Sequence, residues 1–344
     1  MVHIHKTHME QLTSLFAYVE RIGEQFHHGY TQGASIRGIA RKRRIVCAGM
    51  GGSILGAECF QTLALSERIP VHVTIWQTYG LPHEVLALRP LVCCISYSGN
   101  TEETLSAFDT ARNHSLPLMA FSTDGVLLRK AKNAHVIHPV IPDAIVPRFS
   151  VAYMFGFLTG MYDKQSVNPV KLPSALFNGV NPNHIFLAQK QIRKKARAIA
   201  RVINSTRCLV YTIPALTSLG HVWEINLNET AKTLAFADDI PDTDHHALAA
   251  LAWQKSVKDF TALVIRGFEE SPAMRKRLKL SEQTLRSIGL KTISIQLEGK
   301  TIREKILFGL ALAQMTGLEL AKIKRVNPLE TKIQERFKKQ LRKP

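Results

Sequence analysis

Short β-rich runs alternate with longer stretches of helical apolar spacing, and this alternation constrains the fold more than any other feature of the sequence. In the first half of the chain the β-rich runs are residues 44–48, 72–76, 91–96, 117–122 and 135–139. The segments between them, such as 54–65 and 102–113, have the length and the apolar spacing of helices. Strands separated by helices in this way predict an α/β fold, with a parallel sheet that carries helices on both faces.

A second series of the same kind follows a segment rich in Pro, Gly and Asn at 163–182. Its predicted strands are 207–213, 261–266 and 291–297, and its predicted helices are 216–234, 245–255 and 272–288. Two further helices are expected at 301–323 and 328–341, and an N-terminal helix within 1–28. A chain of 344 residues is long enough for two cores. We therefore expect two Rossmann-like lobes, at 30–165 and 185–344, the second including the C-terminal helices.

The composition is that of a globular cytoplasmic protein. Hydrophobic residues make up 45% and charged residues 21% of the chain. The sequence has no run of roughly 18 apolar residues, and its first residues lack the apolar stretch of a secretory signal, so no membrane association is expected. The five cysteines have no CxxC spacing, and Cys47, Cys93 and Cys94 fall in predicted buried strands. Reduced core thiols are expected rather than a metal site.

The formal net charge of +18 raises the question of a nucleic-acid partner. The basic residues occur in scattered helical runs, for example 41–44, 193–195 and 338–343, without interleaved aromatic residues or a nucleic-acid-binding motif. We expect them to form solvated faces and to attract an anionic substrate. Nucleic-acid binding is the alternative, and it would show as salt-sensitive affinity.

A glycine loop follows the first predicted strand. Residues 49–53 read Gly-Met-Gly-Gly-Ser and precede a helix, which lets the backbone approach a ligand at a helix N-terminus. A dinucleotide site would need the full GxGxxG pattern and an acidic residue after the second strand, where Gln77 and Thr78 stand instead. A tight turn without a ligand is the alternative.

A hydroxyl-rich loop follows the third predicted strand. Residues 96–104 read Ser-Tyr-Ser-Gly-Asn-Thr-Glu-Glu-Thr and lead into a helix at the carboxyl edge of the sheet. Hydroxyls, free backbone amides and the helix dipole together suit a phosphate group without a metal. The alternative is an ordinary helix cap made by Ser98 or Thr101.

The two loops together resemble the sugar isomerase (SIS) domain, and the tandem arrangement resembles the bifunctional phosphoglucose/phosphomannose isomerases. By this resemblance Ser96, Ser98 and Thr101 hold the sugar phosphate, and Gly51, Gly52 and Ser53 line the sugar. Pro147-Arg148 matches the Pro-Arg step of the family, whose arginine faces a negatively charged enediolate.

The second lobe carries further family segments. Residues 228–232, Asn-Glu-Thr-Ala-Lys, resemble the family's Asn-Glu-Asn-Ala-Lys, which makes Glu229 the base. Residues 240–246, Ile-Pro-Asp-Thr-Asp-His-His, resemble Ile-Pro-Glu-x-Asn-His-Asn, which makes His245 the ring-opening histidine, and Thr331 and Lys338 fit a C-terminal Thr and Lys. The departures from these segments are Thr230, Asp242, Asp244 and His246, and we expect them to affect rate and substrate preference more than fold.

The types of these residues suit sugar-phosphate isomerisation even when the family resemblance is set aside. Moving a proton between adjacent sugar carbons needs one carboxylate that takes and returns it, a role that suits a buried Glu229 with a raised pKa. His245 and Lys338 would exchange protons with the ring oxygen, and Arg148 would stabilise the oxyanion. Each of these residues also has an alternative role. Glu229 could be exposed or form an ion pair with Lys232, His245 could merely begin a helix, and Lys338 could belong to a solvated basic tail.

The expected activity is aldose–ketose isomerisation of glucose 6-phosphate and mannose 6-phosphate to fructose 6-phosphate, with no cofactor, metal or nicotinamide. The resemblance further implies a homodimer in which His245 enters the neighbouring subunit's site. The competing readings are an SIS isomerase of another sugar phosphate and a non-catalytic sugar-phosphate sensor.

Overall fold

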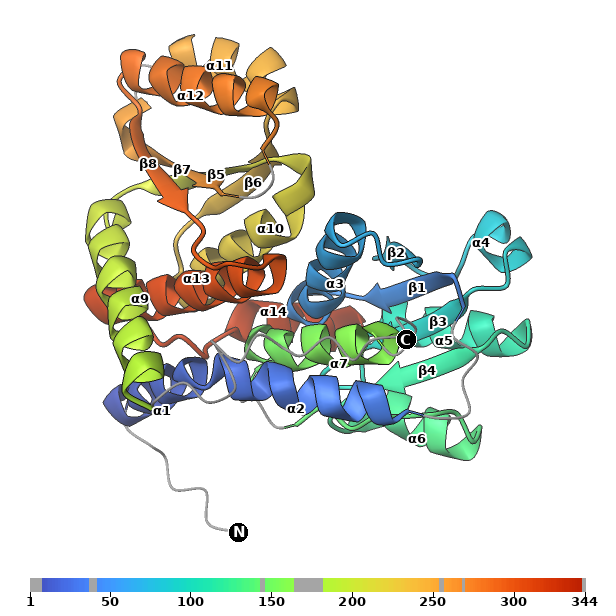
Figure 1. The fold of residues 1–344 in the computed structure, drawn as a ribbon. Coiled ribbons are helices and arrows are strands. Elements are labelled where there is room, and N and C mark those ends of the chain that lie inside the picture. Colours follow the sequence, from blue (N-terminus) through green and yellow to red (C-terminus); the bar gives the residue numbers. More distant parts are fainter. Residues whose placement is uncertain are drawn as a thin grey trace.

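Two four-stranded parallel sheets organise the chain (Figure 1). The computed structural model describes residues 8–36, 42–142, 146–163, 182–253, 257–267 and 270–341. The first sheet has the order β2-β1-β3-β4, and its strands are β1 (Arg44–Gly49), β2 (His72–Trp76), β3 (Leu91–Ile95) and β4 (Leu118–Phe121). The second has the equivalent order β6-β5-β7-β8, with β5 (Arg207–Thr212), β6 (Ala235–Asp239), β7 (Phe260–Arg266) and β8 (Lys291–Gln296). The predicted α/β fold with two parallel-sheet lobes is confirmed.

Helices flank both sheets. In the first half of the chain they are α1 (His8–Glu20), α2 (Ile22–Ser35), α3 (Leu55–Ser66), α4 (His83–Ala87), α5 (Glu102–Asn113), α6 (Gly125–Asn133) and α7 (Val151–Asp163). In the second half they are α9 (Pro182–Ile203), α10 (Thr217–Ile225), α11 (Ala247–Trp253), α12 (Pro272–Ser287), α13 (Ile302–Lys324) and α14 (Lys332–Leu341). The crossing segment predicted at 163–182 lies almost entirely outside the described residues.

Helices α2 and α7 pack with their backbones in contact, which fixes the start of α7. A Cβ atom added at Gly29 would lie 2.0 Å from the carbonyl oxygen of Tyr153, and one added at Gly156 would lie 2.0 Å from that of Phe26. Only glycine permits this approach at either position. Since α7 begins directly after the turn Pro147–Phe149, the packing also fixes where Arg148 lies.

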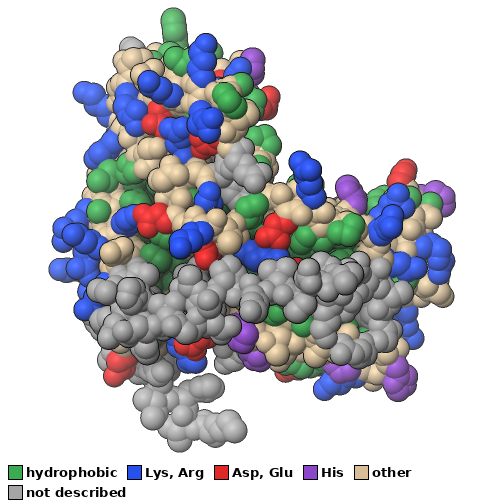
Figure 2. Space-filling model, in the orientation of Figure 1, with side chains coloured by type: hydrophobic (Ala, Val, Ile, Leu, Met, Phe, Trp, Pro, Cys, Tyr) green, Lys and Arg blue, Asp and Glu red, His purple; other side chains and the backbone are tan. Residues whose placement is uncertain are grey.

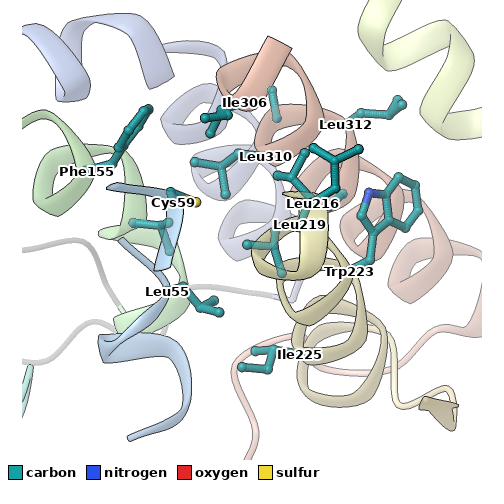
Figure 3. Close-up of a cluster of buried hydrophobic side chains, with 14 of the residues drawn as sticks. Leu55, Cys59, Phe155, Leu216, Leu219, Trp223, Ile225, Ile306, Leu310 and Leu312 are labelled. Carbon is teal, nitrogen blue, oxygen red and sulfur yellow. The ribbon is translucent and has the colours of Figure 1, made fainter. Parts of the chain in front are cut away.

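The two lobes share one hydrophobic core (Figure 3). Leu55 and Cys59 of α3 and Phe155 of α7 lie on the side of α10 that carries Leu219, and Trp223 extends the cluster on its other side. Helix α13 contributes Ile306, Leu310 and Leu312 to the same cluster. Among the described helices α13 alone is long and apolar enough to cross a membrane, yet 83% of that apolar window is buried inside the fold. Its hydrophobicity is therefore explained by its place in the core.

Polar contacts also join the lobes. The Arg303 guanidinium of α13 bonds the carboxylates of Asp163, at 2.7 Å, and of Glu67, at 2.6 Å. The His221 imidazole of α10 lies 2.8 Å from the Glu58 carboxylate of α3. Because a buried cation needs a partner, these contacts specify how the lobes are placed against each other.

The His221–Glu58 contact predicts a pH-dependent stability. Burial lowers the pKa of His221, but the hydrogen bond and charge of Glu58 outweigh it, so the pKa is raised above its ordinary value. The protonated imidazole therefore stabilises the fold fully below the unfolded pKa of about 6.5, and this contribution is lost as pH rises through the folded value. Urea unfolding measured from below pH 6.5, about the unfolded pKa, to alkaline pH should show the loss in the wild type and not in His221→Gln. Equal pH slopes in both proteins would contradict the assignment.

Basic side chains cover the outer helices, as the sequence predicts. Figure 2 shows Lys and Arg gathered along the left edge and the upper end of the molecule, where Figure 1 places α9 and α12. Lys194, Arg197 and Arg201 of α9 are exposed, as are Arg275 and Lys276 of α12. These are solvated helix faces.

Five predicted elements differ from the structure, and one of them is the helix expected at 328–341, which begins at Lys332. Residues 135–139 form no strand: His135 has φ 51°, and only isolated bridges at Ile137 and Val140 extend the first sheet. The helix expected at 216–234 is interrupted, and the edge strand β6 follows it unpredicted. Only Ala235 of β6 is buried, and the next four residues alternate between exposed and partly exposed. The helix expected from His245 begins at Ala247. The helix expected within 1–28 is divided into α1 and α2 at Arg21.

Candidate functional site

The glycine loop after β1 closes onto the turn that carries Arg148. Gly51, Gly52 and Ser53 form a short 3-10 turn, and Gly51 has φ 53°, a conformation that favours glycine. A Cβ atom at Gly52 would lie 2.7 Å from the backbone nitrogen of Arg148. The loop is therefore held against Arg148 by close backbone packing, and a larger residue at Gly52 would displace one of the two segments.

Arg148 joins three parts of the chain through its guanidinium. It is 1% exposed, Nε donates to Thr230 Oγ1 at 2.8 Å, and Nη1 donates to Glu229 Oε2 at 2.8 Å. Nη2 donates to the carbonyl of Pro328, in the segment that leads to α14. Burial lowers the pKa of Arg148, while Glu229 opposes part of that effect. Among the described residues, Glu229 is the carboxylate that pairs with this buried cation.

Glu229 stands on a π-helical turn that interrupts the predicted helix. The turn spans Asn226–Thr230 directly after α10, and the Ala231 N–H bonds the Asn226 carbonyl at 3.2 Å. Lys232 ends it with φ 51°. Such turns occur frequently at functional sites. Here the extra residue in the turn lets two consecutive side chains, those of Glu229 and Thr230, accept hydrogen bonds from the same Arg148 guanidinium.

The Glu229 side chain is half-buried, with 28% of it exposed, and so lies between the buried carboxylate expected from the sequence and the exposed alternative. Oε2 accepts from Arg148, and Oε1 has no hydrogen bond from the described residues. Lys232 does not pair with this carboxylate; its ammonium donates to the backbone carbonyls of Glu229 and Glu330. One carboxylate oxygen is thus fixed while the other remains available to a ligand.

The hydroxyl-rich loop lies next to the glycine loop. Ser96 Oγ donates to Thr101 Oγ1 at 2.9 Å, and the Tyr97 N–H donates to Ser53 Oγ at 3.1 Å. Ser98 is exposed, and its Oγ accepts from the Asn100 N–H at 3.3 Å. Thr101 precedes α5 without capping it through its side chain, so the ordinary helix cap is not formed. The loop presents hydroxyls and the N-terminal amides of α5 at the carboxyl edge of the sheet.

Among the described residues, His245, Lys338 and Thr331 make no hydrogen bond or ion pair with Arg148 or Glu229. His245 ends a short 3-10 turn after β6 and is exposed, while the neighbouring Asp244 carboxylate accepts from Ser281. Lys338 is exposed on α14, and Thr331 Oγ1 donates to Glu335.

Two contributors to the site were not predicted from the sequence. Gln314 is 2% exposed in the apolar middle of α13, and it donates to the Arg148 carbonyl at 2.8 Å. A lone amide in an apolar helix marks such a contact. The Pro328 carbonyl has no side-chain signature, and only the folded chain reveals it.

A separate cleft of about 780 Å³ lies between the lobes along α3 and α10. Its lining includes Glu58, His221, Glu224, Asp238 and Asp239, and it contains none of the cluster around Arg148. Four carboxylates against one imidazole disfavour a phosphorylated ligand there.

Known proteins are similar to this chain over much of its length. Residues 192–341 match the family model of the bacterial phospho-glucose isomerase C-terminal SIS domain. The bifunctional phosphoglucose/phosphomannose isomerase of Aquifex aeolicus is 26% identical over 94% of this chain and 98% of its own length. The D-glucosamine-6-phosphate 4-epimerase of Sulfolobus acidocaldarius is 24% identical over 67% of this chain and 71% of its own length.

The fold also matches solved structures. A crystal structure of a phosphosugar isomerase from Clostridium difficile 630, assigned that activity provisionally, superposes with a TM-score of 0.69 at 10% identity. The match covers 98% of this chain and 99% of that one. At this identity the likeness establishes the two-lobed fold alone.

Proposed function

Because this chain belongs to the bifunctional phosphoglucose/phosphomannose isomerase family, we propose that it interconverts glucose 6-phosphate and mannose 6-phosphate with fructose 6-phosphate. The observation that carries the proposal is the Arg148–Glu229 pair, since it holds a half-exposed carboxylate where the glycine loop meets the second lobe. We further propose that the protein acts in the cytoplasm without a cofactor.

Glu229 is the proposed base. Its Oε1 removes the proton from C2 of the open-chain aldose and returns it to C1, through an enediolate intermediate. The bond from Arg148 Nη1 to Oε2 holds the carboxylate in one orientation. A guanidinium has five N–H groups, and three of the five are used by Thr230, Glu229 and Pro328. Its positive charge stabilises the enediolate from beside the base.

Ser96, Ser98 and Thr101 are the proposed phosphate ligands. Their loop and the N-terminus of α5 offer hydroxyls, amide N–H groups and the positive end of the helix dipole. Gly51, Gly52 and Ser53 would line the sugar between this loop and Arg148. The Tyr97–Ser53 bond supports the two loops acting as one surface.

The double substitution Ser98→Ala with Thr101→Ala tests this phosphate site. Each lost bond to a charged group removes about 1 to 3 kcal/mol of binding, so KM for fructose 6-phosphate should rise by at least about tenfold. Thr110→Ala, which removes a hydroxyl further along α5, is the matched control and should leave KM unchanged. A KM unchanged in the double variant as well would place the phosphate elsewhere.

His245 and Lys338 are proposed to serve ring opening, and Thr331 is proposed to bind the substrate. His245 is further proposed to come from a second subunit. His245 is exposed, and none of its described contacts reaches Glu229 of its own chain. The helix that follows it, α11, ends in Trp253, which is 88% exposed. An exposed catalytic segment of this kind fits a homodimer with isologous contacts, in which each copy completes the site of the other.

A coupled assay tests the proposed activity. Fructose 6-phosphate is supplied, and glucose 6-phosphate and mannose 6-phosphate are detected separately. We expect both products from the protein without added metal. Binding of fructose 6-phosphate without either product would support a sensor, and conversion only of an amino sugar phosphate would support a different SIS enzyme.

A further inference from the structure

The segment 325–331, which joins α13 to α14, is bonded to the Arg148 cluster through its backbone. The carbonyl of Pro328 accepts from Arg148 Nη2. Two residues further on, the carbonyl of Glu330 accepts from Lys232 Nζ at 2.5 Å. The two donors belong to different lobes, so the joining segment is held where the lobes meet.

The residues that follow depend on this attachment for their position. No residue of α14 is buried, and the side chain of Thr331, just before the helix, bonds Glu335 within it. A helix of ten residues is marginal in water without packing. The place of Thr331 and of Lys338 relative to Glu229 is therefore set chiefly by the bonds of the joining segment.

Lys232 connects the joining segment to the turn that carries the proposed base. Its Nζ also donates to the carbonyl of Glu229 at 2.5 Å. A lysine that bonds the last carbonyls of a helical turn is common, but the bond to Glu330 reaches across 98 positions of the sequence. Although Lys232 is an exposed residue, burial of its ammonium and the nearby charge of Arg148 lower its pKa. The ammonium is thus held between two carbonyls instead of moving freely in solvent.

We propose that Lys232 is a positioning residue that holds the joining segment, and through it Thr331 and Lys338, beside Glu229. The Glu229 carboxylate keeps its own support, because Arg148 Nη1 bonds it directly. Ring opening, by contrast, depends on a residue that the joining segment carries. Loss of Lys232 should therefore slow ring opening more than proton transfer. The roles of Thr331 and Lys338 rest on the proposed function, whereas the attachment rests on the two bonds of Lys232.

Fructose 6-phosphate and its 5-deoxy analogue separate the two steps. The 5-hydroxyl closes the furanose ring, so the analogue stays open-chain and needs no ring opening. Lys232→Met should lower kcat/KM for fructose 6-phosphate by about 10- to 100-fold, because the ring-opening group is misplaced, and should leave that for the analogue within about threefold. Lys232→Arg, whose guanidinium can donate to both carbonyls, should recover most of the lost activity. NMR follows both conversions.

Lys324→Met is the matched control. Lys324 is a second lysine whose pKa is lowered by burial, and its Nζ donates to Thr233 Oγ1 at 2.6 Å and to the carbonyl of Lys232 at 3.5 Å. Its described bonds do not include the Glu330 carbonyl, so the ratio of the two kcat/KM values should stay that of the wild type. An equal loss on both substrates in Lys232→Met, or no loss on either, would overturn the proposal.

Amide hydrogen exchange gives a readout that does not depend on activity. Residues 331–341 should exchange at least about tenfold faster in Lys232→Met than in the wild type and in Lys324→Met, because the attachment of α14 is weakened. Unchanged exchange would show that Lys232 does not hold the segment. A wild-type protein that converts neither substrate would overturn the proposed function, and the exchange measurement alone would then decide whether Lys232 holds α14 in place.

Discussion

Glu229→Gln is expected to lower kcat by about 10²- to 10⁴-fold while KM stays within a few-fold. The amide keeps the shape of the carboxylate, and its oxygen can still accept the bond from Arg148 Nη1 that holds the side chain at 2.8 Å. What it loses is the ability to take a proton from C2. The substitution therefore separates proton transfer from binding, which a substitution by alanine would not do.

The control for this experiment is Glu224→Gln. Glu224 lies on α10, just before the π-helical turn that carries Glu229, and it lines the separate cleft between the lobes instead of the Arg148 cluster. Burial raises its pKa, so it resembles a catalytic carboxylate in this respect without the geometry of one. Initial rates in the coupled assay should be normal in Glu224→Gln. Normal rates in Glu229→Gln would remove Glu229 from the mechanism.

Local sequence patterns were sufficient to predict the elements that carry the site loops. Strand β2 and helix α5 have the predicted bounds, because each combines one clear period with a turn signal at both ends. The loops after β1 and β3 then follow from the fold class, since parallel strands bring their carboxyl ends to one edge of the sheet. The sequence therefore predicts that these two loops lie next to each other.

The contacts around Glu229 could not be predicted in the same way. A π-helical turn depends on one extra residue in an otherwise ordinary helical pattern, and its apolar spacing resembles that of an α-helix. The bonds of Arg148 to Thr230 and to Pro328 span 82 and 180 positions of the sequence. Such bonds arise from tertiary packing, here from the glycine contacts of α2 with α7 and of Gly52 with Arg148.

The separation of Glu229 from His245 has a consequence that mixing can test. Glu229→Gln and His245→Ala are each expected to be inactive, yet a heterodimer of the two would have one site with both lesions and one site with neither. Such a heterodimer should regain about half of the wild-type activity, and a randomly exchanged mixture about a quarter. The measurement follows joint partial denaturation and refolding, with each parent refolded alone and exchange confirmed by a mass tag.

Glu229→Gln mixed with Arg148→Met provides the matched negative control. Arg148 and Glu229 are bonded within one chain, so in that heterodimer each site carries one lesion and no intact site can form. Recovery in the first mixture and none in the second would require that the histidine crosses between subunits while the base and the arginine stay together. If both mixtures remain inactive although exchange has occurred, then His245 acts within its own chain or takes no part. Since no described contact brings His245 to Glu229 in one chain, action within the chain would then require a movement of the 242–245 turn toward the cluster.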